Sequence, residues 1–410
     1  METPSLENPV QAKAKLPRPL PILPPDLIAE ILTWLPVVSL LRFRSVSKCF
    51  KTLISSPDFV KAHRRCTKAL SAVKPNRVDR LFRRSFNFFH RPIHRQNERR
   101  PLVFDWGSSS WSLESLYNGP RIEVAERVDV FLGVDNGGGD HVVGSCDGLL
   151  CSVVGLYHGV VVWNPCTRVV RELPAFRCDI SEEQMRGCVR IFGFGYDCQL
   201  DDYKVVVAIS YPTGNHGTDE FETQVQVFAL KTKSWRRIED FKYGVPRCSG
   251  VKFAAGSLYY KVPSSRGDGN PEWQETLVSL DLATEKYNKV KLPDFGDSGA
   301  HWEIESLVDR LCLASFDDGD SCVVWVMKEP RVTDAWTKLF RVDQVVVDAG
   351  FRTPLYISDN GEALWENYED LFIYNPKVNT VRFPTSRSLP DRDGPVVIYL
   401  ETLVSPEMYN

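Results

Sequence analysis

The sequence lacks the features that would place the protein in a membrane or on nucleic acid. No apolar run approaches the 18 residues that span a bilayer, since even residues 153–163 contain His158 and two glycines. The N-terminal residues contain no apolar signal core, so the eleven cysteines indicate a reducing cytoplasmic or nuclear compartment. Lysine and arginine (50) nearly balance aspartate and glutamate (53), and a net charge of -3 argues against a dedicated nucleic-acid binder. We therefore expect a soluble protein without a membrane partner.

The sequence also lacks the motifs of known catalytic and metal sites. None of the seven histidines lies in an HExxH pattern, and no two cysteines have CxxC spacing. His141, Cys146 and Cys151 could ligate a metal, but their spacing does not match a zinc finger, and Cys151 alternates with apolar neighbours as a buried strand residue would. Residues 144–148 lack the serine spacing of a nucleophile elbow, and Gly-x-Gly within 192–197 precedes no helical pattern. We expect no catalytic residue, no metal and no cofactor.

The 410 residues fall into regions that differ in amino-acid composition. Residues 1–22 are rich in proline and predict a flexible tail. Residues 61–100 hold 13 lysines and arginines against two acids, and we interpret residues 71–101 as a basic linker. Residues 81–90 mix arginines with aromatic residues, a composition that can bind phosphate and stack on bases, so RNA binding is one alternative.

Residues 23–36 have the pattern of an amphipathic helix. Pro25 and Asp26 begin it, Pro36 ends it, and the apolar side chains between them recur at helical spacing. Residues 38–54 predict a second helix, and Ser56 predicts the N-cap of a third that reaches residue 70. Of the 32 residues from 23 to 54, 18 are apolar, which is more than three short helices can bury. Part of this surface must meet a partner.

From residue 102 onward, short alternating strands are separated by turn residues. One phrase recurs: an apolar strand, a D/N-x-x-T turn, and an aromatic or basic strand. Its six copies span residues 103–116, 161–173, 226–238, 278–292, 323–339 and 372–383. The copies are spaced by 45 to 65 residues, as the blades of a β-propeller with loop insertions are. The side chains of Asn, Asp and Thr should bond the turn backbone.

Two segments carry a family resemblance. Residues 23–54 resemble an F-box through Leu23-Pro24, Ile31-Leu32 and Leu35-Pro36, with Phe50 where many F-boxes have tryptophan. Residues 145–151 (SCDGLLC), 161–174, 192–206, 225–238 and 324–340 resemble the F-box-associated, kelch-like domain of plant F-box proteins. Only residues 136–139 offer the Gly-Gly doublet that kelch repeats carry in each blade, so the blade count stays open.

The resemblance implies an α+β multidomain protein, with a small three-helix F-box at 23–70 and an all-β, propeller-like (kelch-type) domain at 102–404. Such a protein is a substrate receptor of an SCF (Skp, cullin, F-box) ubiquitin ligase, which binds the Skp-type adaptor, and through it the cullin, and presents a target protein without catalysing a reaction. Adaptor contacts would then come from the F-box residues Leu23, Pro24, Leu27, Ile28, Ile31, Leu32, Leu35, Pro36, Leu40, Val46 and Phe50.

Three alternatives remain at this point. A propeller can host an enzyme in its central channel, which would require clustered histidines or paired carboxylates. An RNA-binding protein would use residues 61–100 and show salt-dependent affinity. A third alternative keeps the adaptor but omits ubiquitin transfer.

Overall fold

The computed structural model describes four helices followed by sheets. The described residues are 23–73, 79–87, 105–112, 126–127, 141–154, 159–178, 180–181, 184–185, 187–213, 221–247, 251–263, 275–295, 301–307, 309–316, 321–328, 336–343, 353–358, 360–366, 371–383 and 396–408. The expected tail at 1–22 lies outside them. Within the described residues, no helix is long and apolar enough to cross a membrane.

The helical unit has four helices rather than the three expected from the sequence. These are α1 (Pro25–Thr33), α2 (Val37–Phe43), α3 (Lys48–Ser55) and α4 (Pro57–Val73). The expected single helix over 38–54 is wrong because a new N-terminus forms inside it: Ser47 is extended, and its hydroxyl accepts a hydrogen bond from the Phe50 amide at 3.1 Å. Ser56 caps the next helix as predicted, since its hydroxyl accepts from the Phe59 amide.

The rest of the described chain forms six four-stranded antiparallel sheets. The first contains β1 (Asp79–Asn87), β2 (Asp105–Ser112), β3 (Glu126–Arg127) and β24 (Val396–Leu400). The second contains β4 (His141–Cys146), β5 (Leu149–Val154), β6 (Gly159–Asn164) and β7 (Val169–Glu172). The third contains β8 (Val189–Asp197), β9 (Asp202–Pro212), β10 (Phe221–Ala229) and β11 (Ser234–Arg237).

The chain continues through three further sheets in the same manner. The fourth contains β12 (Lys252–Ala254), β13 (Ser257–Pro263), β14 (Glu275–Asp281) and β15 (Tyr287–Val290). The fifth contains β16 (His301–Leu307), β17 (Arg310–Phe316), β18 (Ser321–Met327) and β19 (Trp336–Asp343). The sixth contains β20 (Pro354–Ile357), β21 (Ala363–Glu366), β22 (Leu371–Asn375) and β23 (Thr380–Arg382). The sheets are the blades of a β-propeller, as the recurring phrase predicted.

The two ends of the chain close the propeller. The inner strands β4, β8, β12, β16, β20 and β24 contact one another in a ring, and β24 is joined to its blade by pairing with β1. In that pairing Leu81 lies opposite Ile398, and on the other side of β1 it lies opposite Trp111. The first blade is thus built from both ends of the chain, which leaves no open sheet edge between first and last blade.

This closure corrects the expected basic linker at 71–101. Helix α4 continues to Val73, and residues 79–87 form β1 inside a blade rather than a connector. The propeller therefore begins before the expected boundary at 102. The local sequence did not reveal this strand, because the partners that make residues 79–87 a strand include β24 at the opposite end of the chain.

The turns between the outer strands have the chemistry that the recurring phrase indicated. The Asn164 side-chain oxygen accepts hydrogen bonds from the amides of Cys166 (2.8 Å) and Thr167 (3.3 Å). Asp281 accepts from the amides of Ala283 (3.0 Å) and Thr284 (2.8 Å) in the same way. These short polar side chains accept hydrogen bonds from turn amides that would otherwise need a backbone acceptor. The flanking strand residues can therefore pack in the sheet.

Candidate functional site

Helix α1 is apolar on two sides, and one side faces outward. Leu27, Ile31 and Trp34 follow one another at helical spacing and are 46%, 52% and 54% exposed. Val38 and Val46, which follow in the chain, are exposed as well. We call the exposed apolar residues Leu23, Leu27, Ile31, Trp34, Val38, Phe43 and Val46 the outer helical face. Large apolar side chains gathered on so small a unit are typical of a protein-binding surface.

The other side of the helices forms their core. Leu32 and Leu40 are buried, and Ile28, Leu35 and Phe50 are partly buried against the same cluster. Leu32 and Leu40, two of the expected adaptor contacts, therefore lie in the core of the helices and not on their surface. The helical spacing did not reveal this because apolar residues occupy both sides of α1.

The structure divides the eleven expected contact residues accordingly. Leu23, Pro24, Leu27, Ile31, Pro36 and Val46 are exposed, whereas the other five are buried or partly buried. The sequence-based set did not include the exposed residues Trp34, Val38 and Phe43. Trp34 could have been included, since it lies three residues after Ile31 and seven after Leu27, which is the spacing of one helix side.

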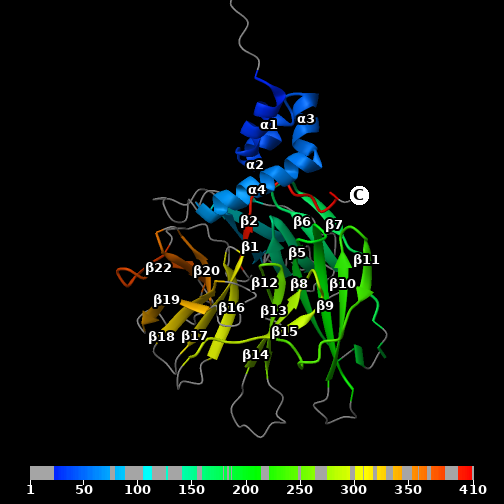
Figure 1. The fold of residues 1–410 in the computed structure, drawn as a ribbon, viewed down its shortest axis with the longest axis vertical. Helices are drawn as coiled ribbons and strands as arrows, with labels where there is room; N and C mark the ends of the chain where they lie inside the picture. Colours follow the sequence, from blue (N-terminus) through cyan, green and yellow to red (C-terminus); the bar gives the residue numbers. More distant parts are fainter. Residues whose placement is uncertain are drawn as a thin grey trace, which may run out of the picture.

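Helix α4 lies between the other helices and the propeller (Figure 1). Its Arg64 side chain enters the propeller, where its guanidinium donates to Asp147 (Nη1 to Oδ2, 3.1 Å) and to the hydroxyls of Tyr203 and Tyr196 (3.1 Å each). The same guanidinium stacks over the Tyr196 ring at 4.6 Å. Lys68 Nζ lies 2.6 Å from Asp147 Oδ1. A buried carboxylate is therefore neutralised by two cations from the helical unit.

We call the contacts of α4 with the propeller the junction. Its electrostatics favour the charged forms of its ionisable side chains. Burial opposes the charge of Arg64, but its interactions with Tyr203 and Asp147 outweigh burial and raise its pKa. Burial likewise opposes the charge of Lys68, and the nearby Asp147 carboxylate raises its pKa. Asp201 lies 2.5 Å from Lys61 Nζ; although burial opposes its ionisation, the bond from Lys61 leaves its pKa lowered. Arg64, Lys68 and Asp201 are therefore charged at neutral pH.

One continuous apolar core joins the two regions. Val37, Leu40 and Phe59 of the helices belong to the same buried cluster as Leu149 of the propeller and Leu403 of the C-terminal segment. That segment is held in turn by Asn164, whose side-chain amide donates to the carbonyls of Thr402 and Val404. The helical unit is thus packed directly on the propeller.

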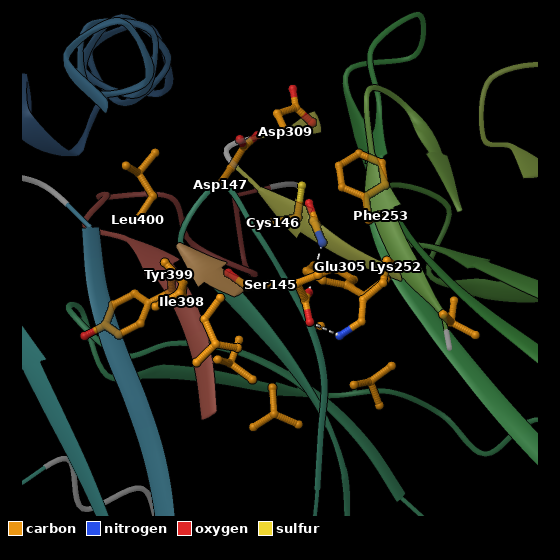
Figure 2. A pocket seen from close by; sticks show the side chains of 18 of the residues that line it. Ser145, Cys146, Asp147, Lys252, Phe253, Glu305, Asp309, Ile398, Tyr399 and Leu400 are labelled. Atoms are coloured by element: carbon orange, nitrogen blue, oxygen red, sulfur yellow. Dashed lines mark hydrogen bonds and ion pairs between the residues drawn. The ribbon is translucent and has the colours of Figure 1, made fainter. Parts of the chain in front are cut away.

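A cavity of about 450 Å³ occupies the ring of inner strands beneath α4. Figure 2 shows Asp147 and Asp309 at one end of it, with the Lys252–Glu305 ion pair (2.6 Å) further in. Residues of β24 and β4, from Val396 and Val142 onward, form its apolar wall. We call this space the channel cavity.

Comparisons with known proteins agree with this architecture. The F-box domain model matches residues 20–62, and the F-box associated beta propeller domain model matches residues 96–388. The chain belongs to this family of F-box proteins. Among its relatives in Arabidopsis thaliana, F-box/kelch-repeat protein At3g23880 is 29% identical over 94% of this chain and 96% of its own. F-box protein CPR1 is 30% identical over 84% of this chain and 79% of its own.

Solved structures share only a general likeness with this F-box protein. An oligogalacturonate lyase in complex with manganese aligns with a TM-score of 0.42 and 11% identity, over 68% of this chain and 70% of the lyase. At that similarity its activity does not transfer to this chain.

The described part of this F-box protein holds no group of three or more His, Cys, Asp or Glu side chains placed to bind a metal. Cys151 is fully buried in β5, as its alternation with apolar residues predicted. Burial raises the pKa of the Cys151 thiol, and together with Asp147 it raises that of Cys146. Both thiols therefore stay protonated at neutral pH and are weak nucleophiles.

Proposed function

We propose that this F-box protein is the substrate-recognition subunit of an SCF-type ubiquitin ligase, which binds a Skp-type adaptor through its helices and a target protein through its propeller. The observation that carries the proposal is the outer helical face. Leu27, Ile31 and Trp34 expose large apolar surface on a helix whose opposite side is already buried in the chain's own core. A second protein would complete the burial of this helix.

The junction supports a receptor role for the propeller. Arg64 and Lys68 fix α4 on Asp147, and a shared core backs this contact. A target held on the propeller would then keep a constant position relative to an adaptor held on α1. The cullin, the degradation of the target, the kelch-type ancestry of the blades and a cytoplasmic or nuclear location all stay predictions from the family.

The adaptor contact can be tested by placing charge on the outer helical face. The Leu27→Asp/Ile31→Asp variant should lose co-purification with a Skp-type adaptor, because each carboxylate would be buried without a partner, at a cost of about 2 kcal/mol or more. Val378→Asp/Phe383→Asp is a matched control, since both residues are exposed apolar positions on the propeller. The control should bind the adaptor normally. Unchanged co-purification of the α1 variant, with its circular dichroism intact, would refute this contact.

A further inference from the structure

The channel cavity is bounded by the inner strands of all six blades. Each of these strands contributes lining residues, and all five residues of β24, from Val396 to Leu400, belong to the wall. A strand advances about 3.3 Å per residue, so the cavity extends roughly 13 Å along the inner strands. Its volume of about 450 Å³ falls within the range of small-molecule sites, about 300–1,000 Å³. The space can therefore hold an organic molecule with an extended body.

The two ends of the cavity differ in polarity. Val142, Leu355 and Val396, at or near the starts of their inner strands, form one end. Asp147 and Asp309, which follow the ends of β4 and β16, form the other, on the side of α4 (Figure 2). A ligand that fills this space therefore needs an apolar body and a polar head group on the side of α4.

The buried carboxylates around the cavity already have cations as partners. Asp147 pairs with Arg64 at 3.1 Å and with Lys68 at 2.6 Å, both from α4. Further into the cavity, Glu305 pairs with Lys252 at 2.6 Å. Neither carboxylate therefore requires a charged ligand for its neutralisation.

The third carboxylate, Asp309, belongs to the same balanced set. It accepts a hydrogen bond from the Ala255 amide at 2.9 Å. Although burial opposes the charge of Lys68, the carboxylates of Asp147 and Asp309 raise its pKa. Three cations thus face three carboxylates, and their formal charges sum to zero: Arg64, Lys68 and Lys252 against Asp147, Glu305 and Asp309.

This balance determines which head group the cavity favours. A charged head group would be buried without a counterion of its own, which costs affinity. An ion pair still offers hydrogen bonds to an uncharged group, because an ammonium group has three donors and a carboxylate has several acceptor positions. A head group that both donates and accepts, such as a primary amide, can use both partners of such a pair.

We propose that the channel cavity binds an uncharged small molecule with an extended apolar body and a head group that both donates and accepts hydrogen bonds. The head group would lie on the side of α4, near Lys68 and Glu305, and the body would extend toward Val142 and Val396. A glutamine side chain of a partner protein is a poorer source of such an amide, because α4 lies over the polar end and the side chain would have to cross the cavity from the apolar end. This proposal does not depend on the ubiquitin-ligase role.

The proposal can be tested with three probes of equal chain length: hexanamide, hexylamine and hexanoate. Ligand-observed NMR titration of the full chain at pH 7.5 should show saturable binding of hexanamide. Both ions should bind about tenfold more weakly or worse, because each buries a charge without a counterion. Propanamide, which corresponds to a glutamine side chain, should also bind about tenfold more weakly, because it lacks the apolar body.

Each probe can overturn the proposal on the parent chain. Equal or tighter binding of either ion would contradict the preference for an uncharged head group. Equal binding of propanamide would show that the apolar body contributes nothing, and the absence of hexanamide binding would overturn the assignment altogether.

The Lys252→Met variant tests whether the charge balance sets this preference. Methionine keeps an apolar stem but removes the ammonium group, so Glu305 loses its partner in the pair. Hexylamine affinity should then rise about tenfold, because its ammonium group replaces the missing cation. Lys338→Met is the matched control, since Lys338 is exposed on β19, the outermost strand of its sheet, and all probe affinities should stay as in the parent. An unchanged hexylamine affinity in Lys252→Met, with its circular dichroism intact, would contradict the proposal.

Discussion

The helical unit and the propeller differ in how deeply they bury their large apolar side chains. In α1 and the residues after it, Leu27, Ile31 and Trp34 are about half exposed. In the propeller, bulky residues such as Trp365 and Tyr259 are almost completely buried. The propeller closes on itself through β1 and β24, so its core is buried within one chain. The contrast indicates that the propeller folds around its own core, whereas α1 leaves an apolar side uncovered, which the proposed adaptor would bury.

The largest expected effect comes from opening the closed region. A fragment that begins at Pro101 lacks β1, so β24 loses the strand that joins it to its blade. We expect it to aggregate or to lose the cooperative unfolding transition. A domain that began at 102, as the sequence suggested, would instead leave this fragment complete and able to fold.

A fragment that begins at Lys74 is the control for this truncation. It keeps β1 and should fold as a monomer, with a lower melting temperature because Asp147 has lost Arg64 and Lys68. Size-exclusion chromatography and thermal circular dichroism compare the two fragments. If both stay monomeric with the same melting temperature, the chain does not close the propeller through β1.

The junction between the two regions should be the next most sensitive place. Arg64→Ala removes three hydrogen bonds and leaves the buried Asp147 carboxylate with Lys68 as its remaining cation. We expect a loss of about 3 kcal/mol in the free energy of unfolding, measured by urea denaturation. Arg65→Ala is the control, since the neighbouring Arg65 is exposed, and it should change stability by less than about 0.5 kcal/mol. Equal effects of the two substitutions would argue against the junction.

A pH dependence should distinguish the helical unit from the propeller. His63 of α4 is buried, with its Nε2 3.1 Å from the Leu35 carbonyl oxygen, and burial lowers its pKa below the ordinary 6.5. The folded protein therefore binds this proton less well than the unfolded chain, so stability should fall as pH falls below 6.5, by up to about 1.4 kcal/mol per pH unit.

Denaturation curves between pH 7.5 and 5.5 measure this effect. His63→Gln should flatten the profile, because it removes the buried imidazole. A parent profile that His63→Gln does not alter would exclude His63 as its source.

Sequence reasoning recovered the elements whose signals are local. The helix at 23–36 and the turns at Asn164 and Asp281 could be predicted because caps and short polar side chains act within a few residues. It failed for β1, whose pairing depends on a strand from the other end of the chain. It also could not show that Leu32 is buried and Ile31 exposed, since α1 is apolar on both sides and only tertiary packing decides which side faces inward. No sequence pattern predicted the channel cavity, because the residues that line it come from separate blades.

The central claim is that the outer helical face serves a partner while the inner side serves the fold. It is tested most directly by comparing Leu27→Ala with Leu32→Ala, two equal truncations in one helix. We predict that Leu27→Ala weakens calorimetric affinity for a Skp-type adaptor by about tenfold or more and changes the unfolding free energy by less than about 0.5 kcal/mol. Leu32→Ala should instead lower the unfolding free energy by about 2–5 kcal/mol. Leu27→Ala that leaves adaptor affinity unchanged, or destabilises the protein as much as Leu32→Ala does, would contradict the account.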